Sequence, residues 1–155
     1  MKTTTHIIYQ TQKLYKENIH FLSRSKGYAL GYHRHSYYVV VKDENDKILS
    51  YIGFNVMGGG DKLRHEKYKE KKVIITNIFS YTRPKYRRMG YNKRCNKALI
   101  NFLSKKYNMR QIQFDDYFST KLGANSQECR IKYFHEKVGM GYKNLRKGCL
   151  KLNIS

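Results

Sequence analysis

A run of basic residues closes on a glycine directly before a stretch with helical periodicity. The run spans residues 83–92, RPKYRRMGYN, and its cations are Arg83, Lys85, Arg87 and Arg88. Like charges this close repel one another, and the backbone dipoles at a helix start already favour anions. Gly90 lets the backbone approach a ligand closely, and the arginines can donate bidentate hydrogen bonds to phosphate oxygens. The pattern therefore predicts a site for a diphosphate or polyphosphate, carried by a cofactor or by nucleic acid.

The segments around this run alternate between strand-like and helix-like patterns. We expect strands at 5–9, 36–42, 48–56, 72–82, 110–117 and 147–155, and helices at 12–22, 92–108 and 125–139. The turn cluster DENDK makes the second and third strands a hairpin. Strand–helix–strand units joined to a meander predict an α/β (α+β) fold with a mixed sheet, and the length fits a single domain over 1–155.

Three features are expected to define the two long helices. Asn92 is a plausible N-cap for the first, whose apolar stripe is Cys95, Leu99, Phe102 and Leu103. Asn125 and Glu128 have the spacing of a capping box at the start of the second helix. Gly139 stands where a C-terminal glycine belongs.

With the element order in place, the basic run resembles a motif of the GNAT superfamily of acetyl-CoA-dependent N-acyltransferases. That motif, V-x-P-x-[YF]-[QR]-x-x-G-x-[GA], follows the fourth strand of the family, and residues 82–92 here read TRPKYRRMGYN. The sequence departs from it at the last position, where Asn92 replaces Gly or Ala. The resemblance implies a single GNAT-like domain with a mixed, mostly antiparallel central sheet flanked by helices.

The resemblance also implies how acetyl-CoA would bind. Backbone amides around the glycine would hold the coenzyme A pyrophosphate, and the edge of the preceding strand would pair with the pantetheine arm. The implied cofactor-binding residues are Ser80, Tyr81, Thr82, Arg87, Arg88, Met89, Gly90, Tyr91, Asn92 and Lys93.

Acetyl transfer to an amine needs a base for the substrate ammonium. The common glutamate of the family would fall near Thr76 or Asn77, and neither is a base. Asp115 and Asp116, at the end of the next strand, are the nearest carboxylates, although Asp at a strand end also has an ordinary turn role. A water relay is the alternative.

The thiolate leaving group needs an acid, which the family places in a late F-Y-x-K-x-G-F pattern. Here YFHEKVGM puts His135 at the tyrosine position, while shifted alignments put Lys137 or Tyr133 there. His135 and Tyr133 are both competent proton donors. The structural alternative is a buried tyrosine or a solvated histidine on an amphipathic helix.

The charge of the chain is its strongest compositional signal. Lys and Arg number 32 against 11 Asp and Glu, a formal net charge of +21. Such a surplus attracts polyanions, so we expect nucleic acid or a nucleic-acid-associated protein as partner. Tyr68, Tyr86, Tyr91 and Tyr107 interleave with the cations and could stack on bases. A lysine-rich surface that reflects coding bias is the alternative.

The remaining signals exclude other classes. Cys95, Cys129 and Cys149 form no CxxC pair, which predicts reduced thiols in a cytoplasmic protein. His33 and His35 have no third ligand nearby, so we expect surface histidines and no metal. We see no secretion signal and no apolar run long enough to span a bilayer, which argues against a membrane protein.

Three functions remain open from the sequence. The first is a GNAT-type N-acetyltransferase acting on an amine of a polyanionic or nucleic-acid-associated acceptor. The second is a non-catalytic nucleic-acid-binding protein on the same fold. The third is an acetyltransferase for small-molecule amines.

Overall fold

The computed structural model describes residues 1–9, 11–22, 35–58, 73–107, 112–115, 121–138, 142–146 and 149–152. Its strands are β1 (Thr3–Tyr9), β2 (Tyr37–Asp43), β3 (Ile48–Gly58), β4 (Val73–Thr82), β5 (Ile112–Asp115), β6 (Tyr142–Arg146) and β7 (Cys149–Leu152). Its helices are α1 (Lys13–Glu17), α2 (Ile19–Leu22), α3 (Tyr91–Lys106) and α4 (Lys121–Val138), with a 3₁₀ turn over Pro84–Tyr86.

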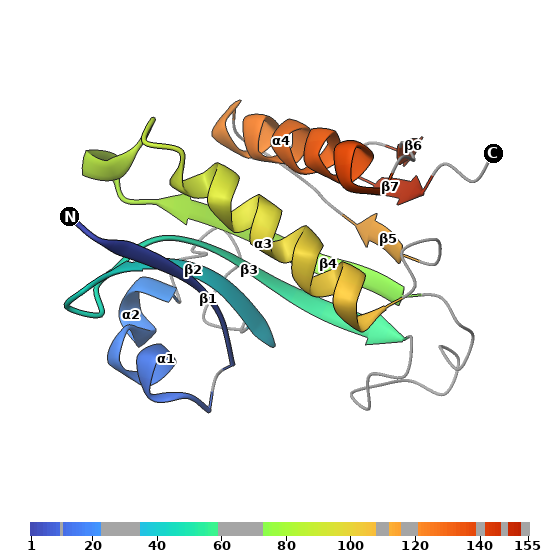
Figure 1. The fold of residues 1–155 in the computed structure, drawn as a ribbon. Coiled ribbons are helices and arrows are strands. Elements are labelled where there is room, and N and C mark those ends of the chain that lie inside the picture. The colour runs from blue at the N-terminus through green and yellow to red at the C-terminus, as the bar shows by residue number, and fades with distance from the viewer. Residues whose placement is uncertain are drawn as a thin grey trace.

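The strands form one mixed sheet in the order β1-β2-β3-β4-β5-β7-β6. All neighbours pair antiparallel except β4 and β5, which are parallel. The helices α3 and α4 lie on one face of this sheet, and α1 and α2 lie against the other (Figure 1). The predicted α/β class with a mostly antiparallel, helix-flanked sheet is therefore confirmed.

Alternation along β2 explains why both faces are covered. Tyr37, Val39 and Val41 are buried on the α3 side, whereas Tyr38 and Val40 are buried on the α1 and α2 side. Successive strand residues point to opposite faces, so a β-branched run without polar residues needs a helix layer on each side. The sheet thereby separates two apolar clusters.

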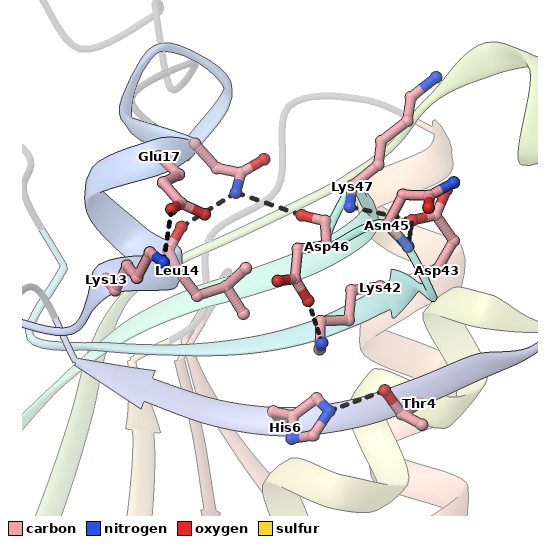
Figure 2. A network of polar contacts seen from close by, with 11 residues as sticks. Thr4, His6, Lys13, Leu14, Glu17, Lys42, Asp43, Asn45, Asp46 and Lys47 are labelled. Atoms are coloured by element: carbon pink, nitrogen blue, oxygen red, sulfur yellow. Dashed lines mark hydrogen bonds and ion pairs between the residues drawn. The ribbon is translucent and has the colours of Figure 1, made fainter.

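The turn between β2 and β3 is held by its own side chains, as Figure 2 shows. The Asp43 carboxylate accepts hydrogen bonds from the backbone N–H of Asn45 at 2.9 Å and of Lys47 at 3.0 Å. Asp46 has a φ of 62°, which Asp tolerates better than most residues, and its carboxylate pairs with Lys42. The predicted hairpin is confirmed, with its turn chemistry built into DENDK.

Several predicted boundaries were wrong. The first helix is broken at Asn18, whose side-chain amide bonds to the Leu14 carbonyl at 3.0 Å and to the Asp46 carbonyl at 3.4 Å. Helix α3 is capped by Gly90, so Asn92 is not the N-cap. Helix α4 begins at Lys121, which places Asn125 and Glu128 inside it. A strand that was not predicted, β6, forms a hairpin with β7, and Gly139 lies outside the described residues.

Candidate functional site

The strands β4 and β5 pair over only part of their length. Val73, Ile74 and Ile75 pair with Ile112, Gln113 and Phe114, while β4 continues to Thr82. The β3–β4 register shifts between Gly53 and Asn55, where β4 holds an extra residue against β3. A bulge bends its strand and ends pairing on the far side. Among the described strands, none pairs with residues 78–82 on the β5 side, which leaves a backbone edge there for a ligand.

The side chains on this edge belong to the sheet. Thr82 Oγ1 lies 2.6 Å from Ser50 Oγ, and the ring of Tyr81 contacts Phe21 at 5.5 Å between centroids. The backbone of Ser80 pairs with that of Ile52 in the neighbouring strand β3. What Ser80, Tyr81 and Thr82 offer a ligand is therefore chiefly backbone N–H and C=O groups, as an extended amide-bearing arm would need.

The edge leads directly into a tight turn before α3. After the 3₁₀ turn, Arg88 has a φ of 63° and Gly90 a φ of 80°. When residues in left-handed and right-handed conformations alternate, successive backbone N–H groups can point at one anion. We call residues 87–93 the cradle.

Gly90 is the N-cap of α3 and supplies no side-chain acceptor. The first-turn amides of Tyr91, Asn92 and Lys93 therefore have no acceptor within the helix. With no acidic residue in this first turn, the helix start presents amide donors to solvent. This is the arrangement that a phosphate group needs.

The cations around the cradle divide into two groups. Arg83 donates from Nε to the Ile48 carbonyl at 2.7 Å and covers the Phe21 ring at 3.8 Å, so it docks the turn onto the sheet. Arg94 donates to the hydroxyls of Thr3 and Thr5 at 2.5 and 2.9 Å, which ties α3 to β1. The remaining cations are exposed: Lys85, Arg87, Arg88 and Lys93.

No carboxylate of the described residues pairs with these exposed cations. The ion pairs of the described residues are Lys13–Glu17 and Lys42–Asp46, and neither lies at the cradle. Arg87 donates from Nε to the Thr82 carbonyl at 3.0 Å, which holds its stem along the end of β4. Arg83, which the sequence groups with these cations, is thus held against the sheet, and the exposed charge beside the cradle comes from the other group.

Asn92, where the family motif has Gly or Ala, turns its side chain along α3. Its Oδ1 accepts a hydrogen bond from Asn96 Nδ2 at 3.0 Å. Asn96 in turn contacts Ser126 and Arg130 of α4, and all three are buried. Sequence reasoning missed these residues, although polar side chains four apart on the buried side of each helix were a visible signal.

The predicted proton-transfer residues lie on two elements. Tyr133 is half-buried between α3 and α4, where its hydroxyl donates to Asn101 Oδ1 at 3.3 Å and Lys97 lies 5.3 Å from its ring centroid. His135 is two residues further along α4, about half a turn away, and Asp115 is the last residue of β5, opposite Cys149. Asp116 lies outside the described residues. The hydroxyl of Tyr133 thus faces α3, and the roles of these residues stay predictions.

Cys95 is fully buried under α3. Its thiol points to the Val39 carbonyl at 3.8 Å and to Ser50 Oγ at 4.0 Å. Burial raises the pKa of the Cys95 thiol to about 12, because the thiolate would lose its hydration. This thiol is structural and serves no nucleophilic role at neutral pH.

Alkylation tests this assignment. At pH 8 we expect iodoacetamide to modify Cys95 at least about a hundredfold more slowly than an ordinary thiol, because so little thiolate forms. Peptide mass mapping in native and denatured protein measures the rates, with the partly exposed Cys129 as internal control. Equal rates for the two cysteines in native protein would contradict the buried position.

Two further expectations concern histidine and membranes. His35 is 1% exposed and packs edge-on against Tyr38, so the expectation of a surface histidine was wrong for it. His33 lies outside the described residues. Among the residues that the structure describes, no cluster of potential metal ligands occurs. In the same residues, no helix is both long and apolar enough to cross a membrane.

Comparison with known proteins identifies the fold. No protein-family profile matches the sequence. No curated protein matches it either. The catalytic domain of the Tetrahymena GCN5 histone acetyltransferase, solved with coenzyme A, aligns with a TM-score of 0.54 at 15% identity over 100% of this chain and 96% of its own.

Two other solved structures agree with that alignment. An acetyltransferase of the GNAT family from Staphylococcus aureus Mu50 gives a TM-score of 0.51 at 11% identity, covering 96% of this chain and 99% of its own. An integron cassette protein from the mobile metagenome of V. cholerae gives 0.51 at 12% identity, covering 95% and 90%. The chain has the GNAT fold.

Proposed function

We propose that this protein is an N-acetyltransferase that transfers an acetyl group from acetyl-CoA to an amine. The single observation that carries the proposal is the continuity of the open β4 edge with the cradle. The edge suits an amide-containing arm, and the cradle suits the pyrophosphate that follows it in the cofactor. The GCN5 catalytic domain, which has a similar fold and was solved with coenzyme A, supports the same assignment.

In this proposal each part of the chain has a distinct task. The backbone of Ser80–Thr82 aligns the pantetheine arm, and the amides around Gly90 hold the diphosphate. Bound acetyl-CoA supplies the activated acetyl group. Asp115 or Asp116, directly or through water, takes the proton from the acceptor ammonium, and Tyr133 or His135 returns one to the departing thiolate. The protein acts in the cytoplasm as one domain over residues 1–155.

Calorimetry with acetyl-CoA and coenzyme A tests the binding step. We expect saturable one-to-one binding to the wild type, and about tenfold weaker binding after Arg88→Gln with Lys93→Gln, since charge-assisted contacts to phosphate are lost. The matched control is Lys13→Gln with Lys16→Gln, which removes equal charge from α1 on the other face of the sheet. Absence of binding to the wild type, or equal weakening by the control, would refute the proposed site.

The charge distribution favours a particular acceptor. No acidic residue occurs between Arg83 and Arg110, and Lys85, Arg87, Arg88, Lys93, Lys105 and Lys106 are exposed. We propose that the acceptor amine belongs to a polyanion or to a protein bound to nucleic acid, because such a surface concentrates negative partners.

The second candidate, a non-catalytic nucleic-acid-binding protein, rests on the same exposed cations. The two candidates differ in their salt dependence and their need for acetyl-CoA. Nucleic-acid binding through Z phosphate contacts would give a slope of about −0.9Z in log K against log salt on duplex DNA. A steep slope without acetyl-CoA binding would favour the second candidate, and a flat slope with acetyl-CoA binding would favour a small-molecule acceptor.

A further inference from the structure

A chain of buried polar groups joins the first turn of α3 to α4. Asn96, Ser126 and Arg130 are 0%, 4% and 3% exposed. The guanidinium of Arg130 donates from NH1 to Asn96 Oδ1 at 2.7 Å, and Asn96 Nδ2 lies 3.2 Å from Ser126 Oγ. The same nitrogen reaches the carbonyl and Oδ1 of Asn92 at 3.2 and 3.0 Å. We call these residues, Asn92, Asn96, Ser126 and Arg130, the polar linkage.

Arg130 determines the orientation of both asparagine amides. A guanidinium can only donate hydrogen bonds, so Asn96 must turn its oxygen to Arg130 and its nitrogen to Asn92. That nitrogen can also only donate, so the Asn92 side chain can meet it only through Oδ1, next to the Asn92 backbone carbonyl that the same nitrogen reaches. The buried charge of Arg130 therefore orients the partly buried Asn92 carboxamide of the cradle through one intervening residue, Asn96.

The position of this oxygen matters for an anion at the cradle. Asn92 is the second residue of α3, and a side-chain oxygen there can bond to backbone N–H groups of the same turn. Those groups are the donors that a phosphate would use. In the structure Asn92 Oδ1 is committed to Asn96 instead, which leaves the first-turn amides available.

We infer that Asn96 and Arg130 are positioning residues, which hold the Asn92 carboxamide away from the first-turn amides of α3 so that it does not compete with bound phosphate. The inference rests on the proposed function for its ligand. Both residues act through Asn92, and the polar linkage accounts for an asparagine at the motif position where the family has Gly or Ala. Gly or Ala at this position of the family motif has no side-chain oxygen that could compete with phosphate. Here the polar linkage keeps the Asn92 oxygen from competing.

The test combines a broken linkage with a rescue. Asn96→Leu with Arg130→Met removes the donor and the buried charge together, which proteins tolerate better than the loss of one partner. We expect coenzyme A to bind this double variant about five- to tenfold more weakly, the effect of one competing hydrogen bond. Adding Asn92→Ala removes the competitor and should restore the dissociation constant to within about twofold of wild type.

A matched control separates positioning from packing. Asn101→Leu breaks a different hydrogen bond between α3 and α4, to Tyr133, without touching Asn92. We expect its affinity for coenzyme A to equal that of the wild type. An unchanged affinity in the double variant, or a triple variant that stays weak, would overturn the inference.

Failure of the proposed function can be distinguished from failure of this inference. If the wild type binds no coenzyme A, the proposed function fails, and the ligand-free crystal structure of the double variant then decides the inference. Movement of Asn92 Oδ1 to within hydrogen-bond distance of the first-turn amides supports it. An Asn92 side chain that stays beside position 96 overturns it.

Discussion

Replacing Gly90 by valine is expected to weaken coenzyme A binding by at least about thirtyfold and to lower the free energy of unfolding by about 1–2 kcal/mol. Gly90 has a φ of +80°, a conformation that β-branched residues strongly resist. A Cβ at this position would meet no heavy atom within 4 Å, so the penalty comes from the backbone and not from a clash. The relaxed turn would misplace the amides of the cradle.

A graded series of substitutions at position 90 tests whether the backbone conformation, and not a steric clash, controls binding. Ala tolerates the left-handed conformation better than the β-branched Val. We therefore expect the dissociation constant to rise in the order Gly, Ala, Val, measured by calorimetry, with unfolding in urea followed in parallel. Thr11→Ala, at an exposed position before α1 and outside the cradle, is the control and should change neither quantity appreciably. Wild-type affinity in the Val variant would show that backbone conformation does not control the site.

Leu99→Ala is expected to cost about 2–5 kcal/mol of unfolding free energy. Leu99 is fully buried in the middle of α3, within the apolar cluster that α3 shares with β2, β3 and β4. Truncation removes apolar contacts from both the helix and the sheet and leaves a cavity between them. Because α3 begins at the cradle, we also expect weaker coenzyme A binding at temperatures where the variant is partly unfolded.

Urea denaturation followed by circular dichroism measures this loss. Ser104→Ala, five residues further along α3, is the control, since Ser104 is half-buried and its hydroxyl donates to the Asn101 carbonyl of the same helix. We expect the control to change stability by less than about 0.5 kcal/mol. A loss of less than 1 kcal/mol for Leu99→Ala would mean that this cluster does not hold α3 to the sheet.

Local patterns in the sequence accounted for most of the elements. The run YYVVV predicted a strand, DENDK predicted a turn, and the Cys95–Leu99–Leu103 stripe predicted a helix packed by that side. These features depend on neighbours along the chain, where periodicity and turn chemistry act directly. The motif around Gly90 belongs with them, since a left-handed glycine before a helix is a local requirement.

Helix ends were predicted less well, because more than one residue could cap each helix. Asn92 is a good N-cap by type, but the turn places Gly90 there and sends Asn92 into the helix. Asn125 and Glu128 matched a capping box, yet α4 extends four residues further back, to Lys121. A residue's type permits a cap, whereas the path of the incoming chain decides which candidate takes it.

What the sequence determined by itself was the order and type of most of the elements, without β6, and the basic turn with its glycine. Only the tertiary structure decided how β4 parts from β5, that Arg83 and Arg94 serve the sheet while Arg88 and Lys93 face solvent, and that Asn92 reaches α4 through Asn96. The physical reason is that periodicity and backbone preference act between residues close in the chain. Hydrogen bonds such as Arg130 to Asn96 join residues 34 positions apart, and only packing brings them together.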